Sequence, residues 1–205
     1  MDSNNLEDID PDENYLNDFL SSIDCKKFSV HEYINHTNAS ANALSILSYN
    51  IRSVNANLTE FLPVVEQSKP DILIFSVTWF SDDFQADITS YGTHHIIRSD
   101  RRSGGVSVYV NESLRSCRID ELSFANLNIE VCTVQLLFDT ETIFIVGIYR
   151  PHSGTIEAFS SELENILQND LLRNKRCIVA GDFNICLMQN NSNNSRLVET
   201  IQSLH

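Results

Sequence analysis

The sequence predicts an α+β protein in which two β-sheets pack face to face and helices cover the outside. Three observations favour this fold class. Runs with strand character outnumber helical runs, the helices are intermittent rather than alternating with strands, and a strand–helix–strand unit opens the folded part. A chain of 205 residues with 42% hydrophobic and 20% charged residues is long enough for one soluble domain with a sizeable core.

The strand–helix–strand unit begins with "LSILSYN", a strand that runs into polar Asn50, and ends with "KPDILIFSVTW", a second and fully apolar strand. Between them, "NANLTEFLPVVEQS" has apolar residues at the i, i+3, i+4, i+7 spacing of an amphipathic helix, at Leu58, Phe61, Leu62 and Val65. Pro63 lies within this run, and we expect the helix to kink or to start late because of it.

The remaining elements are mostly strands. "GGVSVYVN", "NIEVCTVQLLF" and "TIFIVGIYRP" are three strand candidates with no long helix between them. "SGTIEAFSSELENILQND" follows as a helix, with Thr155 as its N-cap. Its predicted buried stripe consists of Ile156, Phe159, Leu163, Ile166 and Leu167. "RCIVAGDFN" is a further strand, "NNSNNSR" a polar loop, and "SRLVETIQSLH" the start of another helix.

Residues 1–43 form an acidic, mostly disordered leader in this interpretation, with a short helix around "NYLNDFLSSI". The leader lacks the basic-then-apolar order of a signal peptide, and no apolar run approaches the length of a membrane span. We therefore expect an intracellular protein, nuclear or cytoplasmic, with no membrane contact. The five cysteines include no CxxC pair and are predicted to be free thiols in a reducing compartment. They are Cys25, Cys117, Cys132, Cys177 and Cys186.

The formal net charge of −14 argues against strong, unspecific binding to a polyanion, because such binding gains affinity when Lys and Arg release counterions. The charge is uneven along the chain. Residues 1–44 hold nine acidic residues against two lysines, so the folded part is less acidic than the whole. A local basic face is still possible there, and composition neither predicts nor excludes a nucleic-acid partner.

Three of the predicted strands finish on polar residues: Asn50, the pair Tyr149 and Arg150, and the Asp-x-Asn of "GDFN". In an extended segment Asp182 and Asn184 fall on the same side, because side chains repeat every two residues. Such a pair could hold a hydrated Mg²⁺, orient a water or contact a phosphate. It could equally be a strand-ending turn, for which Gly-Asp and Asn are common formers. The occurrence of three such strand ends favours a site.

Five motifs in this order, "LSYNIRSVN", "PDILIFSVTWF", "RRSGGVSVYV", "GIYRP" and "VAGDFN", resemble the endonuclease–exonuclease–phosphatase superfamily. More narrowly, they resemble the endonuclease domain of non-long-terminal-repeat retrotransposon polyproteins. The resemblance covers about residues 44–204. It implies a four-layer α–ββ–α sandwich of the DNase I-like type, over residues 44–205. It also implies hydrolysis of phosphoesters with a divalent metal, Mg²⁺ or Mn²⁺, and DNA as the partner that is nicked.

The resemblance assigns roles to four residues. Asn50 matches the asparagine that positions a metal ligand or an active-site water, and is the one metal-site residue expected here. Tyr149 matches the tyrosine that faces the scissile phosphate. Asp182 matches the aspartate that orients or deprotonates the attacking water, and Asn184 the asparagine that stabilises the transition-state phosphate. Without the resemblance, Asn50 reads as a turn residue and Tyr149 as a half-buried strand aromatic.

One departure from the family pattern concerns the metal. The strand "LIFSVTWF" normally carries a Glu before Thr-Trp, the principal carboxylate on the catalytic metal, and here that position is Val77. Valine offers no side-chain oxygen to a hard cation, so we expect an inactive copy. A one-residue slip that brought Asp82 or Asp83 to the site would sacrifice the Thr-Trp match.

A second departure concerns the carboxyl end. The sequence stops at His205, before the further strands and the Ser-Asp-His segment of the family. We therefore expect a truncated domain without its C-terminal strands, with an exposed sheet edge that is open to self-association. His94 and His95 are predicted to be surface residues of a loop.

Basic residues in "IIRSDRRSGG" and "GIYRP" are the remaining candidates for substrate contact: Arg98, Arg101, Arg102 and Arg150. Those of the first motif could touch DNA phosphates or lie in a solvated loop. The resemblance thus predicts a DNA-nicking domain, inactive in this copy. Two alternatives stay open, a phosphatase or RNase of the same superfamily and a non-catalytic remnant that binds DNA or a protein.

Overall fold

The computed structural model describes residues 43–81, 86–98, 103–185 and 192–202. These residues fall in two compact units, which are described separately. The first unit contains the described residues up to Asn184, and the second contains those from Ile185 onward. The predicted leader and its short helix lie outside the described residues. Within the described ranges, no helix is long and apolar enough to cross a membrane.

The first sheet has the strand order β1-β2-β4-β3. Its strands are β1 (Ile46–Asn50), β2 (Ile72–Ser76), β3 (Tyr91–Ile96) and β4 (Val106–Asn111). β1 and β2 are parallel and are joined by helix α3 (Val54–Ser68), while β4 is antiparallel to both of its neighbours. The predicted strand–helix–strand opening is therefore confirmed.

The second sheet has the order β5-β7-β8-β9, with the short strand β6 (Phe124–Ala125) paired to β7. The other strands are β5 (Arg115–Arg118), β7 (Glu130–Leu137), β8 (Thr142–Tyr149) and β9 (Arg176–Asp182). A 3₁₀ turn over Asp120–Leu122 precedes β6. Helix α4 (Ile156–Leu167) connects β8 to β9, which run parallel to each other. Across both sheets, the sequence predicted β1, β2, β4, β7, β8 and β9 and missed β3, β5 and β6.

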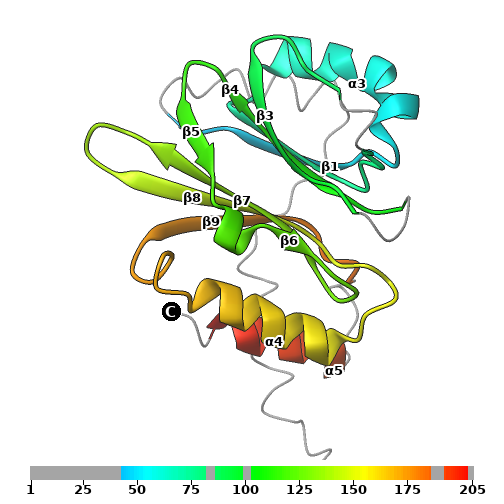
Figure 1. The fold of residues 1–205 in the computed structure, drawn as a ribbon, viewed down its shortest axis with the longest axis vertical. Coiled ribbons are helices and arrows are strands. Elements are labelled where there is room, and N and C mark those ends of the chain that lie inside the picture. Colours follow the sequence, from blue (N-terminus) through cyan, green and yellow to red (C-terminus); the bar gives the residue numbers. More distant parts are fainter. Residues whose placement is uncertain (1–42, 82–85, 99–102, 186–191, 203–205) are drawn as a thin grey trace, which may run out of the picture. The chain divides into compact units, whose positions relative to one another are not determined.

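The two sheets pack face to face, with α3 on the outer face of the first and α4 on the outer face of the second (Figure 1). Alternation along each strand builds these layers. In β2, Ile72 and Ile74 enter the core between the sheets, while Leu73 and Phe75 pack under α3. The sheets approach each other closely at Gly147, where a Cβ would lie 2.9 Å from a methyl group of Val108. The predicted α+β sandwich is confirmed.

Both helices of this unit begin at side-chain caps. The hydroxyl oxygen of Ser53 accepts a hydrogen bond from the Ala56 amide of α3, and that of Thr155 accepts one from Ala158 of α4 at 3.2 Å. Helix α3 neither starts late nor ends at Pro63, which lies inside it. In α4 the predicted stripe buries Phe159, Leu163 and Ile166, whereas its two outer members are half-buried.

The second unit contributes helix α5 (Ser192–Gln202) to the described residues. The helix begins inside "NNSNNSR", so the prediction of a polar loop there is wrong for residues 192–196. Ser192 is a good N-terminal residue for a helix, and the buried pair Leu197 and Val198 gives the first turns an apolar side.

Histidines and cysteines complete the description of the first unit. His94 and His95 lie in β3, half-buried, and not in a surface loop as predicted, because β3 pairs with β4 along their length. Cys117, Cys132 and Cys177 are free thiols. Burial raises the pKa of Cys132 to about 12 and that of Cys177 to about 11, so these two thiols are weakly reactive.

Candidate active site

Strand alternation brings the predicted polar residues to one end of the space between the sheets. Ile46 of β1 and both Ile178 and Ala180 of β9 pack on the inter-sheet core, so residues two or four positions further along face the same way. Asn50 therefore ends β1 facing the second sheet, and Asp182 ends β9 facing the first. In the second sheet, Tyr149 is the register partner of Asp182.

Asn50 and Asp182 are in direct contact across the two sheets. The Asn50 side-chain amide donates to the Asp182 carboxylate, with 2.6 Å between Nδ2 and Oδ2. The other amide atom, Oδ1, is buried and has no hydrogen-bond partner among the described residues; the same holds for the hydroxyl of Ser76, the register partner of Asn50. Unpaired buried oxygens beside a carboxylate are suited to holding a water or a polar ligand.

Asn184 completes this group through its backbone. Its φ of 50° is left-handed, a conformation that Asn adopts more readily than most residues. The Asn184 amide donates to the second oxygen of Asp182 at 3.0 Å, and its side chain donates to the Arg150 carbonyl at 2.7 Å. Both oxygens of the Asp182 carboxylate are thus oriented by donors from neighbouring residues.

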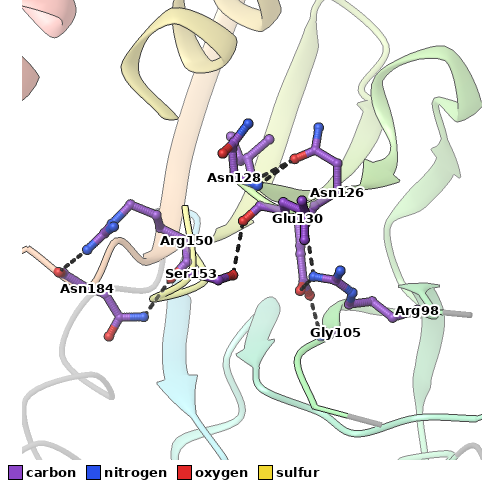
Figure 2. Close-up of polar contacts among 10 residues, drawn as sticks. Arg98, Gly105, Asn126, Asn128, Glu130, Arg150, Ser153 and Asn184 are labelled. Carbon is purple, nitrogen blue, oxygen red and sulfur yellow. Dashed lines mark hydrogen bonds and ion pairs between the residues drawn. The ribbon is translucent and has the colours of Figure 1, made fainter. Parts of the chain in front are cut away.

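Arg150 closes the loop between β8 and α4 onto the end of β9. Its guanidinium donates to the carbonyls of Phe183 and Asn184 at 2.7 Å each and to that of Gly154 at 3.2 Å, and Figure 2 shows it facing Asn184. Burial lowers the pKa of Arg150, and the Asp182 charge opposes this shift. Arg150 is 7% exposed, so a direct contact with substrate would require some of these bonds to open. Tyr149 is similarly buried, at 8%.

Val77 directly follows β2, whose last residue, Ser76, is the register partner of Asn50. The Val77 carbonyl accepts a hydrogen bond from the Ser53 amide at 2.8 Å, and its side chain packs against the inter-sheet core. Its φ of 59° is exceptional, because a β-branched residue is strained in the left-handed region. The position is therefore shaped by the surrounding backbone and is not one that valine itself favours.

The residues after Val77 are held by the glycine pair that precedes β4. The amides of Thr78 and Trp79 donate to the carbonyls of Gly105 and Gly104, at 3.3 and 2.9 Å. Both glycines have positive φ, 103° at Gly104 and 96° at Gly105. A Cβ at Gly105 would collide with the Thr78 hydroxyl. The "SGG" of the sequence is thus a close-packing element against the segment that carries Val77.

A buried ion pair fixes the glycine pair in turn. Glu130, the first residue of β7, is fully buried and accepts from the Gly105 amide and from Arg98, whose guanidinium lies 2.7 Å away (Figure 2). Arg98 also donates to the Asn126 carbonyl at 2.9 Å. Arg98 is thus placed in a buried network and is not a freely exposed phosphate contact. The sequence signal for Glu130 is a charged residue at the start of a mostly apolar strand, a pattern that predicts the strand but not the ion pair.

Among the described residues, this end of the sandwich supplies few oxygen donors to a divalent cation. Mg²⁺ in proteins usually keeps several waters and is bound through one or two carboxylates. The donors here are the Asp182 carboxylate and Asn50 Oδ1, while Val77 offers only a carbonyl that already accepts from Ser53. Within the described part of the chain, no three His, Cys, Asp or Glu side chains are grouped to hold a metal. With no oxygen from the Val77 side chain, the described donors make a weak site for Mg²⁺. Arg101, Arg102, Asp82, Asp83 and His205 lie outside the described residues.

Solved structures similar to this chain include a retrotransposon endonuclease domain and AP endonucleases. One is the endonuclease domain of TRAS1, a telomere-specific non-LTR retrotransposon, with a TM-score of 0.62, 16% identity and coverage of 78% of this chain and 71% of that one. A second is the AP endonuclease LMAP from Leishmania major, with a TM-score of 0.60, 17% identity and coverage of 91% and 76%. A third is an AP endonuclease from Archaeoglobus fulgidus, with a TM-score of 0.55, 15% identity and coverage of 79% and 71%.

These likenesses confirm the expected fold. No curated protein matches the chain in sequence. The model of one family does match, over residues 47–195, which is most of the chain. This chain belongs to the endonuclease/exonuclease/phosphatase family.

Proposed function

We propose that this chain is a nuclease-type domain that holds a nucleic-acid phosphodiester at the Asn50–Asp182 end of the sandwich and does not nick it. The proposal rests on the difference between the polar pair Asn50 and Asp182 and the apolar Val77 at the same end of the sandwich. Asn50 and Asp182 are in contact and oriented, while Val77 supplies no side-chain oxygen in the neighbouring strand. DNA is the proposed ligand, because the similar structures include a retrotransposon endonuclease domain and AP endonucleases.

The residues present can bind and orient a phosphate or a water without a metal. The unpaired Oδ1 of Asn50 can accept a hydrogen bond from a water, and Asp182 can orient that water or take up its proton. We assign to Asn184 and Tyr149 the neighbouring contacts to the phosphate. Arg150 supports them as a positioning residue through its bonds to the Phe183 and Asn184 carbonyls.

Cleavage of the phosphodiester depends on a metal as well as on these residues. Family members generally depend on a divalent metal, which would stabilise the charge that develops on the phosphate by several kcal/mol. In this chain we propose that Mg²⁺ or Mn²⁺ is not retained, because the carboxylate expected at Val77 is absent. The loss of a ligand to the metal should reduce activity at least as much as the loss of a supporting residue, which costs about 10- to 100-fold.

Nicking of supercoiled plasmid in Mg²⁺ or Mn²⁺ tests this proposal. The wild-type chain should leave the plasmid supercoiled, and Val77→Glu should introduce metal-dependent nicking, because it returns a carboxylate to a position whose backbone surroundings are intact. Val77→Gln is the matched control, with the same size and no charge, and should stay inactive. Combining Val77→Glu with Asp182→Ala should abolish the gain.

Two results would contradict the proposal. Metal-dependent nicking by the wild-type chain that disappears in Asp182→Ala would mean that another group replaces the missing carboxylate. Cleavage of RNA or of a phosphomonoester, but not of DNA, would identify a different phosphoesterase of the same family. Circular dichroism on each variant separates a loss of activity from a loss of fold.

Self-association is a second candidate function, favoured by the strand order. β1 and β9 are edge strands within the described residues, and Tyr49 on β1 is 47% exposed. Edge strands offer unpaired backbone groups to another strand. Sedimentation equilibrium should then show a dimer that Tyr49→Lys reduces, whereas a monomer at all concentrations would exclude this function.

The proposal also includes a cellular compartment for the protein and a first residue for its folded domain. A DNA ligand places the protein in the nucleus or the cytoplasm, and fluorescence microscopy of a tagged chain would separate the two. We place the start of the domain at residue 44, and limited proteolysis that leaves residues 44–205 intact would support this boundary.

A further inference from the structure

We infer that Trp79 and Arg52 form a docking surface for an unpaired nucleotide next to the phosphate held by Asn50 and Asp182. This inference rests on the proposed function and names the form of nucleic acid that the site takes. Trp79 would stack on the base, and Arg52 would contact a flanking phosphate. Neither residue belongs to the polar group that contacts the scissile phosphate.

Trp79 is exposed where its neighbours are buried. Its side chain is 49% exposed, against 1% for Thr78 and 5% for Phe80. Tyr49, which is also exposed, stacks on Phe61 with ring centroids 4.5 Å apart. Trp79 makes no ring contact with any aromatic residue that the structure describes. A large aromatic face open to solvent at a functional end of a sheet is suited to a binding partner.

The backbone holds Trp79 firmly in this exposed position. Its φ of 55° is left-handed, which an aromatic residue adopts only when the surrounding structure requires it. The Trp79 amide donates to the Gly104 carbonyl at 2.9 Å, and the Thr78 carbonyl accepts from the Val54 amide at 3.0 Å. A side chain presented on a rigid backbone loses less conformational entropy when it binds.

Arg52 lies on the adjoining segment, two residues after Asn50. It is exposed, and its φ of 46° is also left-handed. The next residue donates to the Val77 carbonyl, and the Asn57 side chain donates to the Arg52 carbonyl at 2.7 Å, so the Arg52 backbone is fixed as well. Within the described ranges, the Arg52 guanidinium has no acidic partner. An unneutralised cation on the segment that is hydrogen-bonded to the residues before Trp79 gives this end both a charge and an aromatic face, the combination that binds single strands.

The same observations favour an unpaired nucleotide over a duplex. Base stacking on an aromatic side chain requires a base that is free of its own stack, as in a single strand, a gap or a frayed end. Duplex binding depends more on many basic contacts to the two backbones, and the proposed surface supplies one, Arg52. One aromatic face and one cation therefore match a short unpaired segment.

Trp79 is the only tryptophan in the chain, so intrinsic tryptophan emission reports on this surface alone. The full chain is titrated, without metal, with a single-stranded oligonucleotide, and a fluorescein-labelled copy gives the affinity by anisotropy. We expect the emission to be quenched with the same midpoint as the anisotropy change. Trp79→Ala should weaken binding about tenfold, the effect of one base–aromatic stack, whereas Trp79→Tyr should keep most of the affinity.

The charge and the surface are tested with matched variants. Arg52→Ala should weaken binding and lower the slope of log affinity against log salt by about one, and Arg52→Lys should restore that slope. Leu171→Ala removes a 41% exposed apolar side chain shortly before β9, at the opposite end of that strand from Asp182, and should bind as the wild type does. A duplex of the same sequence should bind more weakly than the single strand.

The two measurements separate this inference from the proposed function. Anisotropy that shows binding, with unchanged emission and wild-type affinity in Trp79→Ala, would overturn the docking surface and leave the proposed function standing. Tighter binding to duplex than to single strand would also overturn it. No anisotropy change with either form of DNA, from a chain that circular dichroism shows to be folded, would overturn the proposed function and the docking surface together.

Discussion

The candidate active site consists of two halves with the same construction and different contents. The Asp182 half contains Asn50, Asp182, Asn184 and Arg150, and the Val77 half contains Val77 to Trp79 with the Gly104–Gly105 pair, Glu130 and Arg98. Each half uses left-handed backbone and a mostly buried arginine. In the first half, polar side chains meet in the space between the sheets. In the second, the polar groups serve only to hold the backbone, and the side chain they present is a valine.

The difference shows that the framework of a site and its reactive group are separable. The framework around Val77 is part of the fold's stability, because Glu130, Arg98 and the glycines are buried and depend on one another. A change of Val77 breaks none of those contacts. The reactive residue can therefore be exchanged while its support remains, and mutations in the two kinds of position should have very different effects.

The largest effect is expected at Glu130. Glu130→Ala should lower the free energy of unfolding by about 3–5 kcal/mol, because it removes the carboxylate that lies 2.7 Å from the buried Arg98 guanidinium. Urea denaturation followed by circular dichroism measures this loss. The control is Asp139→Ala, which breaks the pair with Arg115 where both side chains are exposed and should cost less than about 1 kcal/mol. Equal costs for the two variants would contradict the proposed dependence of the Val77 half on Glu130.

A second test compares one glycine from each half. Gly105→Ala and Gly181→Ala both place a Cβ on a residue with positive φ, which should cost about 1–3 kcal/mol each. Gly181 should be the worse of the two, because its Cβ would strike the Ile148 backbone, whereas that of Gly105 would meet a side-chain hydroxyl. Gly92→Ala is the control, since its nearest neighbour would be 3.8 Å away. Thermal unfolding of the three variants gives the order.

Much of this arrangement could be predicted from the sequence, because local patterns determine it. Apolar runs indicated β1, β2, β4, β7, β8 and β9. The polar residues at three of their ends predicted a shared site, and Asn50 and Asp182 are indeed in contact. The predicted amphipathic helices rest on hydrophobic periodicity, whereas the predicted exposed edge rests on the resemblance. Pro63 did not delay the start of α3, which begins at Val54, and the predicted kink stays a prediction.

The support of the Val77 half could not be predicted, because it depends on contacts between distant segments. Glu130 and Arg98 are 32 residues apart, and neither has a local pattern that predicts the pair. The same applies to His94 and His95, whose strand is too polar to be recognised and forms by pairing with β4. Pairing partners decide such strands more than their own propensities do.

A third prediction concerns the strain at Val77 itself. Val77→Asn should leave the free energy of unfolding unchanged or raise it by up to about 1 kcal/mol, because Asn tolerates the left-handed backbone that strains valine. Val146→Asn, at a fully buried position in β8, should instead be strongly destabilising. Urea midpoints measured side by side check the difference. A large loss at Val77 would mean that its packing outweighs the strain.

The smallest effect should come from His94 and His95, which are next to the Val77 half but not part of it. The ring of His95 packs against that of Phe80, with 5.7 Å between the ring centroids. Burial lowers the pKa of both His94 and His95, and the nearby Arg118 charge lowers each further, while Asp87 opposes this at His95. The unfolded chain therefore binds protons more readily than the folded one. The stabilisation is fully present above the unfolded pKa of about 6.5 and is lost as the pH falls through the lower folded values.

Urea unfolding at pH 7.5 and pH 5.5 would measure this loss, with a His94→Gln/His95→Gln double variant as the control. Acid should destabilise the wild type more than the double variant, since the remaining titrating groups are common to both. Nicking by Val77→Glu should share part of this sensitivity, because the histidine strand supports the segment that presents residue 77. A wild type and double variant with the same pH dependence would show that the two histidines bind protons equally well in the folded and the unfolded chain.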